Sequence, residues 1–243
     1  MALIIGRKPV LEAINSNKNI EQVILRFGQS GGIINAIRAA TKKRNIKLTE
    51  LSKNKFDELV PNKNSQGVAA KISEREYLTL DELILQTKNV EQPLFVILEE
   101  IQDVHNVGAI LRTAECANVN GVIITKRNSA PLNETVAKIS AGAVEHLKIC
   151  QVTNLSQTID TLKQNGYWIV GSSLENAVDY STIDYNMPTA LIMGNEQKGI
   201  RRLTFEKCDH LIKIPMEGKI QSLNVSVSTG VILFEILRQR KNI

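Results

Sequence analysis

Six short apolar runs recur through the second part of the chain, and they constrain its fold more than any other feature. They are LFVIL (94–98), GVIIT (121–125), LKICQV (147–152), YWIVGSS (167–173), TALIM (189–193) and HLIKIPM (210–216). Helical patterns lie between them, near residues 106–118, 132–141 and 155–165. Strands that are apolar throughout are buried on both faces, and helices between them supply the cover. The pattern predicts a mostly parallel α/β sheet over residues 93–243.

A smaller unit precedes this sheet. Strand-like segments at 20–27, 46–51 and 66–72 alternate with helix-like segments at 31–45 and 52–60. This alternation predicts a small α/β domain over residues 1–75. The stretch 76–92 is polar and mixed in charge, so we interpret it as a linker with a short helix over 79–87.

Charge is distributed unevenly between the two parts. Residues 1–75 hold 14 Lys plus Arg against 6 Asp plus Glu, a balance of +8, whereas residues 76–243 hold 16 against 19, a balance of −3. A basic region of this kind is suited to binding a polyanion such as a nucleic acid. A basic solvated surface without a partner gives the same composition, so charge alone leaves both interpretations open.

Several other classes of protein are not indicated. No apolar run reaches the roughly 20 residues of a membrane-spanning helix, and the apolar stretch in MALIIGRKP is too short for a signal peptide. We therefore expect a soluble protein of the cytoplasm that does not bind a membrane. Three cysteines and three scattered histidines do not form a metal-binding pattern. The motifs GxGxxG, GxxxxGK[ST] and GxSxG are also absent from the sequence.

In parallel sheets, ligands bind at the loops that follow the carboxyl ends of the strands. The first such loop leads into NVGAILRTAEC, where Val107, Ile110 and Leu111 lie on the predicted buried face and Arg112 on the other face. We expect Gly108 to leave open backbone beneath the Arg112 guanidinium. The alternative is a surface arginine paired with a nearby carboxylate, with Asn106 as an ordinary helix N-cap.

The second loop is GNEQKGIRRL, which directly follows TALIM. Gly194 would let a ligand approach the backbone, and Glu196 places a carboxylate beyond the strand end. Three cations, Lys198, Arg201 and Arg202, add a basic rim. A tight turn before an acid-favouring helix start is the alternative explanation.

The third loop lies within IQSLNVSVSTG (220–230), between an apolar strand and the final helix. Ser222 or Asn224 would cap that helix. A cap requires only one polar residue, whereas this segment places four Ser and Asn side chains at alternate positions. We therefore expect some of them to serve a binding or catalytic site.

Together, NVGAILRTAECANVNGVII, IMGNEQKGIRRL and IPMEGKIQSLNVSVSTGVILFE resemble the three ordered motifs of the SpoU (TrmH-like) family of RNA ribose 2′-O-methyltransferases. The segments GRKPVLEAI and QGVAAKI resemble the family's N-terminal substrate-binding module, which has a ribosomal-protein-like RNA-binding fold. The resemblance implies a trefoil-knotted (SPOUT-type) C-terminal domain, S-adenosylmethionine as methyl donor without a metal, and a homodimer.

The resemblance also assigns site residues. Arg112 matches the arginine that the family assigns to activation of the 2′-hydroxyl. An electrostatic role is physically easier for this residue than the role of general base, because a guanidinium keeps its proton. One departure is Gln197, where we expect a small residue, and it leaves the shape of that loop open. The matching catalytic positions are Asn106, Arg112, Glu196, Ser222 and Asn224, and the positions of cofactor-binding backbone are Gly194, Ile214 and Leu223.

Within the family, the sequence is most similar to members that methylate a guanosine ribose in the peptidyl-transferase region of 23S rRNA. The expected partner is therefore 23S rRNA or a precursor of the large ribosomal subunit. Methylation of tRNA or of another rRNA loop is the alternative. A non-catalytic RNA-binding protein on the same scaffold is a third hypothesis, which the joint presence of the five catalytic positions disfavours.

Overall fold

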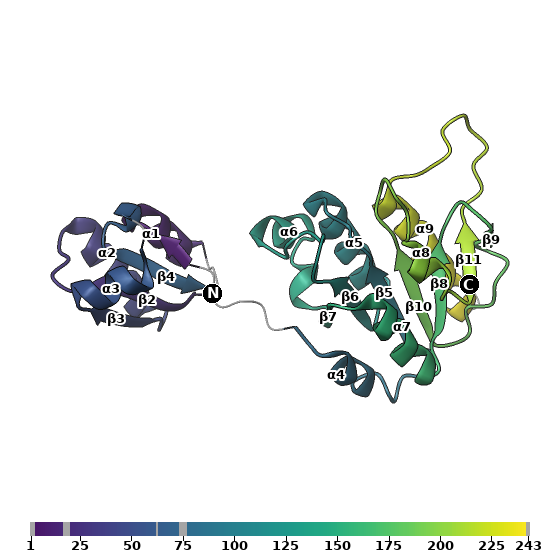
Figure 1. Ribbon diagram of the computed structural model, residues 1–243, viewed down its shortest axis with the longest axis horizontal. Helices are drawn as coiled ribbons and strands as arrows, with labels where there is room; N and C mark the ends of the chain where they lie inside the picture. The colour runs from purple at the N-terminus through teal and green to yellow at the C-terminus, as the bar shows by residue number, and fades with distance from the viewer. Residues whose placement is uncertain (1–2, 17–19, 62, 73–76, 242–243) are drawn as a thin grey trace. The chain divides into compact units, whose positions relative to one another are not determined.

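The computed structural model describes residues 3–16, 20–61, 63–72 and 77–241. The chain divides into two compact units, Met1–Glu76 and Tyr77–Ile243, each with hydrophobic cores of its own (Figure 1). Within the described residues, no helix is long and apolar enough to cross a membrane.

The N-terminal unit is a four-stranded mixed sheet with helices on both faces. Its strand order is β1-β4-β2-β3, in which β2 and β3 are parallel and the other pairings are antiparallel. Ile34 and Ile37 pack on one face of the sheet, and Phe56 packs on the other. The predicted small α/β domain is confirmed. Its elements are β1 (Leu3–Ile5), α1 (Arg7–Asn15), β2 (Ile20–Arg26), α2 (Gly32–Lys43), β3 (Lys47–Leu51), α3 (Lys53–Leu59), a 3₁₀ turn (Lys63–Ser65) and β4 (Val68–Ile72).

The C-terminal unit is built on a seven-stranded sheet in the order β7-β6-β5-β10-β8-β11-β9, and all the strand pairings described in it are parallel. This confirms the predicted mostly parallel sheet. The central strands β5, β6 and β10 are buried at every position, as apolar runs covered on both faces require. The strands are β5 (Leu94–Leu98), β6 (Gly121–Thr125), β7 (Ile149–Val152), β8 (Trp168–Ser172), β9 (Val178–Asp179), β10 (Thr189–Met193) and β11 (His210–Lys213).

Two layers of helices cover this sheet. Helices α5 (Val104–Cys116), α6 (Glu134–Ile139) and α9 (Val225–Lys241) pack on one face. Helices α4 (Leu80–Leu85), α7 (Leu155–Gln164) and α8 (Arg202–Phe205) pack on the other, and a 3₁₀ turn at Ala143–Glu145 follows α6.

The stretch expected to be a linker is mostly part of the second unit. Leu78 forms a parallel bridge to Cys150 beside β7, and Leu83 of α4 is fully buried against the sheet. Thr79 begins α4 with a capping box, in which its side chain accepts from the Glu82 N–H and the Glu82 carboxylate accepts from the Thr79 N–H. The interpretation of 76–92 as a linker is therefore wrong from Tyr77 onward, because one apolar face of α4 completes the core. Residues 73–76 lie outside the described part of the chain.

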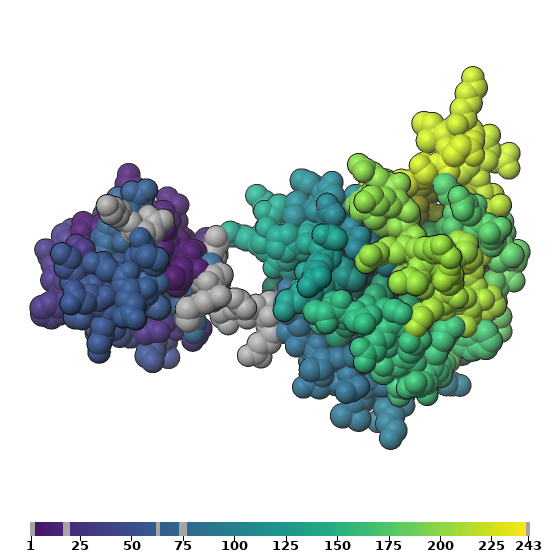
Figure 2. Space-filling model, in the orientation of Figure 1, coloured from purple at the N-terminus to yellow at the C-terminus, as the bar shows by residue number. Residues whose placement is uncertain are grey.

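The final segments of the chain cross back over the sheet. After β11 at one side, residues 214–224 form neither helix nor strand, and α9 then packs against α5 above the middle of the sheet. This irregular segment extends from the surface of the unit in Figure 2. The end of α9 is anchored by the half-buried Arg240, whose guanidinium donates four hydrogen bonds. The acceptors are the carbonyl oxygens of Gln92 (2.7 Å), Tyr185 (3.0 Å) and Met187 (2.8 Å) and the hydroxyl of Thr189 (3.2 Å).

Candidate functional site

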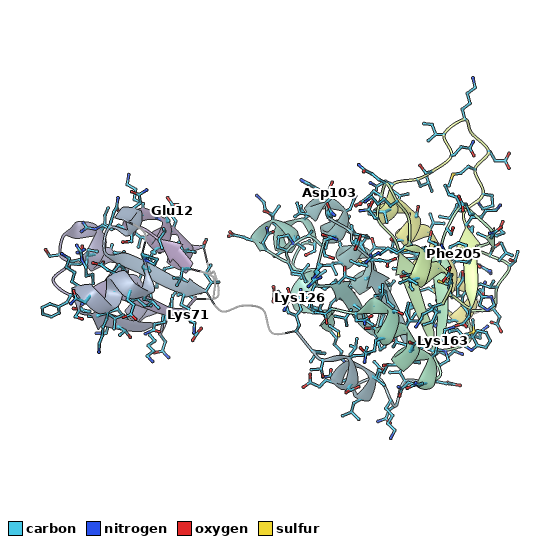
Figure 3. The ribbon with its side chains drawn as sticks, viewed as in Figure 1. Glu12, Lys71, Asp103, Lys126, Lys163 and Phe205 are labelled. Carbon is cyan, nitrogen blue, oxygen red and sulfur yellow. The ribbon has the colours of Figure 1, made fainter. Side chains whose placement is uncertain are left out.

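The three loops singled out in the sequence meet at one edge of the large sheet, because β5, β10 and β11 run in the same direction. The first loop leads into α5, and Asp103 caps this helix, with its Oδ1 accepting from the His105 N–H at 2.7 Å (Figure 3). Asn106 therefore lies in the first turn of α5 and is not the N-cap. Its side chain is free to serve another purpose.

A chain of hydrogen bonds joins residues from all three loops. The Asn106 Nδ2 donates to Glu196 Oε1 at 2.9 Å, across 90 positions in the sequence. Asn224 Nδ2 donates to Asn106 Oδ1, also at 2.9 Å. Asn224 Oδ1 in turn accepts from the backbone N–H of Ser226 at 2.9 Å and from its hydroxyl at 2.6 Å. Three of the five predicted catalytic residues thus form one polar cluster, which we call the Asn–Glu–Asn network (Asn106, Glu196 and Asn224).

The loop that carries Glu196 is closed on itself. Asn195 and Gly199 exchange two backbone hydrogen bonds, at 3.0 and 2.8 Å. A Cβ at Gly194 would lie 2.3 Å from the backbone of Gly199 and Ile200, so glycine is required there by the loop itself. The loop itself therefore fills the Cβ side of Gly194, which was expected to be open to a ligand, and the role of Gly194 as cofactor-binding backbone stays a prediction. Gln197 is exposed, and its backbone N–H donates to Asn195 Oδ1 at 3.0 Å, so its side chain lies outside the closed turn.

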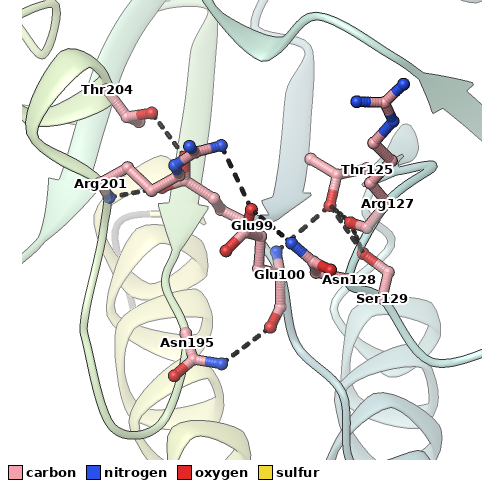
Figure 4. Close-up of polar contacts among 9 residues, drawn as sticks. All are labelled: Glu99, Glu100, Thr125, Arg127, Asn128, Ser129, Asn195, Arg201 and Thr204. Atoms are coloured by element: carbon pink, nitrogen blue, oxygen red, sulfur yellow. Dashed lines mark hydrogen bonds and ion pairs between the residues drawn. The ribbon is translucent and has the colours of Figure 1, made fainter.

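A buried carboxyl group fixes the far end of the same loop. Glu99, which directly follows β5, is 2% exposed. Its Oε2 accepts from the Arg201 N–H at 2.9 Å, and its Oε1 accepts from the Thr204 hydroxyl at 2.6 Å (Figure 4). Burial raises the pKa of Glu99, and these two hydrogen bonds partly offset the effect.

The neighbouring Glu100 links three strands at this edge. Its N–H donates to the Thr125 hydroxyl at 3.2 Å, and its carbonyl oxygen accepts from Asn195 Nδ2 at 2.9 Å. Its carboxylate Oε1 accepts from Asn128 Nδ2 and from Arg201 Nη1, both at 3.2 Å (Figure 4). Glu99, Glu100 and Asn195 were not among the residues predicted from the sequence. Two adjacent acids immediately after a fully buried strand are the signal that could have identified the first two.

Arg112 is not part of the Asn–Glu–Asn network within one chain. It is exposed on α5 and makes no hydrogen bond or ion pair with any residue that the structure describes. Six positions along a helix correspond to about 9 Å and a rotation of roughly 240°, so Arg112 and Asn106 project in different directions. A Cβ at Gly108 would lie 2.6 Å from the Ile139 side chain, so Gly108 admits α6 rather than leaving open backbone beneath Arg112.

The remaining predicted residues lie on the irregular segment between β11 and α9. Ile214 is half-buried and packs against the core, whereas Leu223 is 40% exposed. Ser222 is exposed, and its side chain makes no hydrogen bond among the described residues. Asn224 behaves as a helix cap in addition to its contact with Asn106, because its Oδ1 binds the Ser226 N–H in the first turn of α9.

A separate hollow of about 530 Å³ lies beneath α4. Its lining includes Pro93, Tyr167 and Pro188, which precede β5, β8 and β10, so it lies at the edge of the sheet opposite the Asn–Glu–Asn network. In the described parts of the chain, no three His, Cys, Asp or Glu side chains are grouped as metal ligands would be.

Comparison with known proteins agrees with this arrangement. Residues 93–234, more than half of the chain, match the SpoU rRNA Methylase family, and residues 3–78 match the domain described as RNA 2′-O ribose methyltransferase substrate binding. A TrmH family tRNA/rRNA methyltransferase of Staphylococcus saprophyticus is 43% identical over 99% of this chain and 97% of its own length. The protein YacO of Bacillus subtilis, named for the same family, is 40% identical over 98% of this chain and 95% of its own length.

The fold also matches a solved structure over nearly the whole chain. An rRNA methyltransferase from Sinorhizobium meliloti, crystallised with bound AdoMet, is 27% identical with a TM-score of 0.64. The match covers 97% of this chain and 86% of that one. Both domains and the three ordered loops are thus accounted for by a single family, and the chain belongs to the SpoU rRNA methylase family.

Proposed function

We propose that this RNA methyltransferase transfers the methyl group of S-adenosylmethionine to the ribose 2′-hydroxyl of a guanosine in 23S rRNA, an activity of the RlmB type. The observation that carries the proposal is the Asn–Glu–Asn network. It unites three motifs that are far apart in the sequence, at the edge of the sheet where parallel α/β folds bind ligands.

The network has a defined direction. The Ser226 N–H and hydroxyl donate to Asn224, Asn224 donates to Asn106, and Asn106 donates to Glu196. Each donated hydrogen bond fixes the orientation of the next amide, so the Glu196 carboxylate is held at the end of the series. Its second oxygen, Oε2, accepts no hydrogen bond from a described residue. We assign Glu196 to accepting a hydrogen bond from a substrate hydroxyl and thereby orienting the ribose.

The loops on either side of this network suit S-adenosylmethionine. Backbone groups at Gly194, Ile214 and Leu223 would hold the adenosyl moiety. At Ile214 and Leu223 these groups belong to residues 214–224, which form no regular element that would occupy their N–H and C=O groups. Ile214 and Leu223 add apolar surface beside them. When bound, the cofactor supplies an electrophilic methyl group on a sulfonium, and the protein's own task is to position the two reactants. We propose that no metal takes part, because a sulfonium methyl group needs no metal activation.

We assign an electrostatic role to Arg112. Its guanidinium is a planar cation, so it would bind a phosphate of the RNA and stabilise developing negative charge on the ribose oxygen. Ser222, exposed beside Leu223, would contact the RNA or fix its loop.

We further propose that the protein is a homodimer with the trefoil knot typical of its family. Val227 and Phe234 of α9 are 50% and 53% exposed and lie seven positions apart, so they share one helix face. An apolar face of this kind favours pairing with a second copy. Arg112, which projects away from Asn106, would then be available to the site of the partner subunit.

The N-terminal unit would supply RNA affinity through its charge of +8. The match of this unit to a substrate-binding domain of ribosomal-protein-like fold favours rRNA as substrate, and we propose that the protein acts in the cytoplasm. Methylation of tRNA remains the second candidate, because the relatives carry the joint name tRNA/rRNA methyltransferase.

The direct test is to treat total RNA from a strain lacking the gene with the protein and labelled S-adenosylmethionine, and then to map the modified nucleotide. We expect one 2′-O-methylguanosine in 23S rRNA. Label in tRNA would favour the second candidate, and label on a base rather than on a ribose would refute the proposal.

A variant pair tests the role of Arg112. We expect Arg112→Ala to abolish turnover while S-adenosylmethionine binding persists. Arg112→Lys keeps the charge but loses the planar fork, so partial activity would indicate a mainly electrostatic role. Near wild-type turnover by Arg112→Ala would remove Arg112 from the catalytic residues.

A further inference from the structure

Glu100 adopts a backbone conformation that its residue type disfavours. Its φ is +54°, in the left-handed region that glycine enters without strain and that glutamate rarely adopts. Non-glycine residues held in this region occur preferentially at functional sites, where the surrounding structure maintains them. Glycine would also preserve both backbone hydrogen bonds of this residue, to Thr125 and Asn195. The feature that only glutamate provides is the carboxylate.

That carboxylate holds Arg201. The Glu100 Oε1 accepts from Arg201 Nη1 at 3.2 Å, while the Arg201 backbone N–H donates to the buried Glu99 (Figure 4). The two adjacent acids therefore fix both the backbone and the side chain of this arginine. The Arg201 side chain is nevertheless 68% exposed, so most of its guanidinium faces solvent. Its remaining N–H groups are available to an anionic ligand.

The neighbouring Arg202 provides a contrast. Its Nε donates to Glu206 Oε1 at 2.7 Å, a pair within α8 at i and i+4, and its side chain is 89% exposed. Such surface pairs contribute little and orient nothing outside their own helix. Arg201 instead connects to the Asn–Glu–Asn network, because Asn195, which donates to the Glu100 carbonyl, precedes Glu196.

We propose that Arg201 binds a backbone phosphate of the substrate RNA beside the reacting ribose, and that Glu100 is a positioning residue that aims its guanidinium. This inference rests on the proposed function and extends it to a second cation besides Arg112. A guanidinium suits the task because its fork matches the geometry of a phosphate. The strain at Glu100 is then explained, since replacement by glycine would relax the backbone but release Arg201.

The first test compares Arg201→Ala with Arg202→Ala in the full-length protein, using a transcript that the wild type methylates. We expect Arg201→Ala to raise the KM for RNA by about ten- to hundredfold. It should also reduce the slope of log affinity against log salt by about one, as loss of one phosphate contact predicts. Arg202→Ala should keep both values, and S-adenosylmethionine affinity should not change in either variant. Equal effects of the two substitutions, or an unchanged salt slope for Arg201→Ala, would overturn the proposal.

The second test isolates Glu100. We expect Glu100→Gly to keep or raise Tm while lowering kcat/KM, and to have no further effect on kcat/KM in an Arg201→Ala background. Unchanged kcat/KM, or an equal loss in both backgrounds, would show that Glu100 does not act through Arg201. A fall in Tm would overturn the strain argument, because the contacts of the carboxylate would then outweigh the backbone strain. Failure of the proposed function itself is recognised separately, because the wild type would then transfer no methyl group to a ribose.

Discussion

The substitution Asn106→Asp tests the Asn–Glu–Asn network most directly, because it preserves the shape of the side chain and replaces its hydrogen-bond donor with a negatively charged acceptor. Asn106 Nδ2 lies 2.9 Å from Glu196 Oε1, so the substitution replaces a donor with a second carboxylate oxygen at that distance. The aspartate still has an oxygen in the place of Asn106 Oδ1, which accepts the hydrogen bond from Asn224. The change therefore acts on the contact with Glu196, where it removes a hydrogen bond and adds repulsion between like charges.

The expected effects of Asn106→Asp on activity and on stability differ, because the residues that Asn106 contacts are exposed. A hydrogen bond to a charged group contributes about 1.5–3 kcal/mol where it orients a reactive group, so kcat/KM should fall about ten- to hundredfold. Glu196 and Asn224 are exposed, however, so solvent screens the interaction in the resting protein. We expect a loss of less than about 1 kcal/mol in unfolding free energy, or at most about 2–4 °C in Tm for a unit of this size.

The assay measures kcat/KM for methyl transfer together with Tm. Asn118→Asp is a control for the effect of added charge on kcat/KM, since it adds the same charge at an exposed position just beyond α5. Combining Asn106→Asp with Glu196→Gln should restore Tm, because the glutamine can donate to the new carboxylate, but should not restore activity. Wild-type kcat/KM in the Asn106→Asp variant, or recovery of activity in the double variant, would refute the assignment of Glu196.

Three further outcomes can be checked with simple measurements. Deleting residues 1–75 should weaken RNA affinity severalfold or more, because the deleted part carries the net charge of +8. S-adenosylmethionine affinity should stay intact, because the two units have separate cores. Equal RNA affinity of truncated and full-length protein would contradict this prediction. Arg240→Ala should lower Tm by about 6–12 °C, because the lost hydrogen bonds to three carbonyls and a hydroxyl contribute about 3 kcal/mol to the free energy of unfolding. An unchanged Tm would mean that packing alone holds α9. At pH 8 a thiol reagent should modify the exposed Cys116 but neither of the other cysteines until the protein unfolds, because burial raises the pKa of Cys150 to about 11 and that of Cys208 to about 12.

The large sheet was predictable from sequence because its central strands have no polar face. The bounds of 94–98, 121–125 and 189–193 match β5, β6 and β10, which are buried at every residue. Shorter elements were missed for the opposite reason. Strand β1 has three residues and α8 has four, which is too few for a hydrophobic period to appear. Helix α4 was predicted, but its packing was not, since Leu83 is its one buried residue.

The candidate site was only partly predictable. The motifs identified Asn106, Glu196 and Asn224, but contacts across 90 and 118 positions depend on the parallel order of β5, β10 and β11. Arg201 and Arg202 are indistinguishable in sequence, and only their different acidic partners separate them. Similarly, Gly108 was explained by open backbone beneath Arg112 and Gly194 by an approaching ligand, whereas close packing of α6 and closure of the loop require a glycine at these positions.

Helix capping explains why the site is assembled from asparagines. Asp103 caps α5, which releases Asn106 from that role and leaves both ends of its amide for Glu196 and Asn224. Asn224 does two things at once, since its oxygen binds the first turn of α9 while its nitrogen reaches Asn106. A carboxylate could cap α9 but could not donate to Asn106, and a serine has no second group for that contact. Asparagine therefore couples the start of α9 to the site, so the helix that closes the fold also sets the orientation of the Glu196 carboxylate.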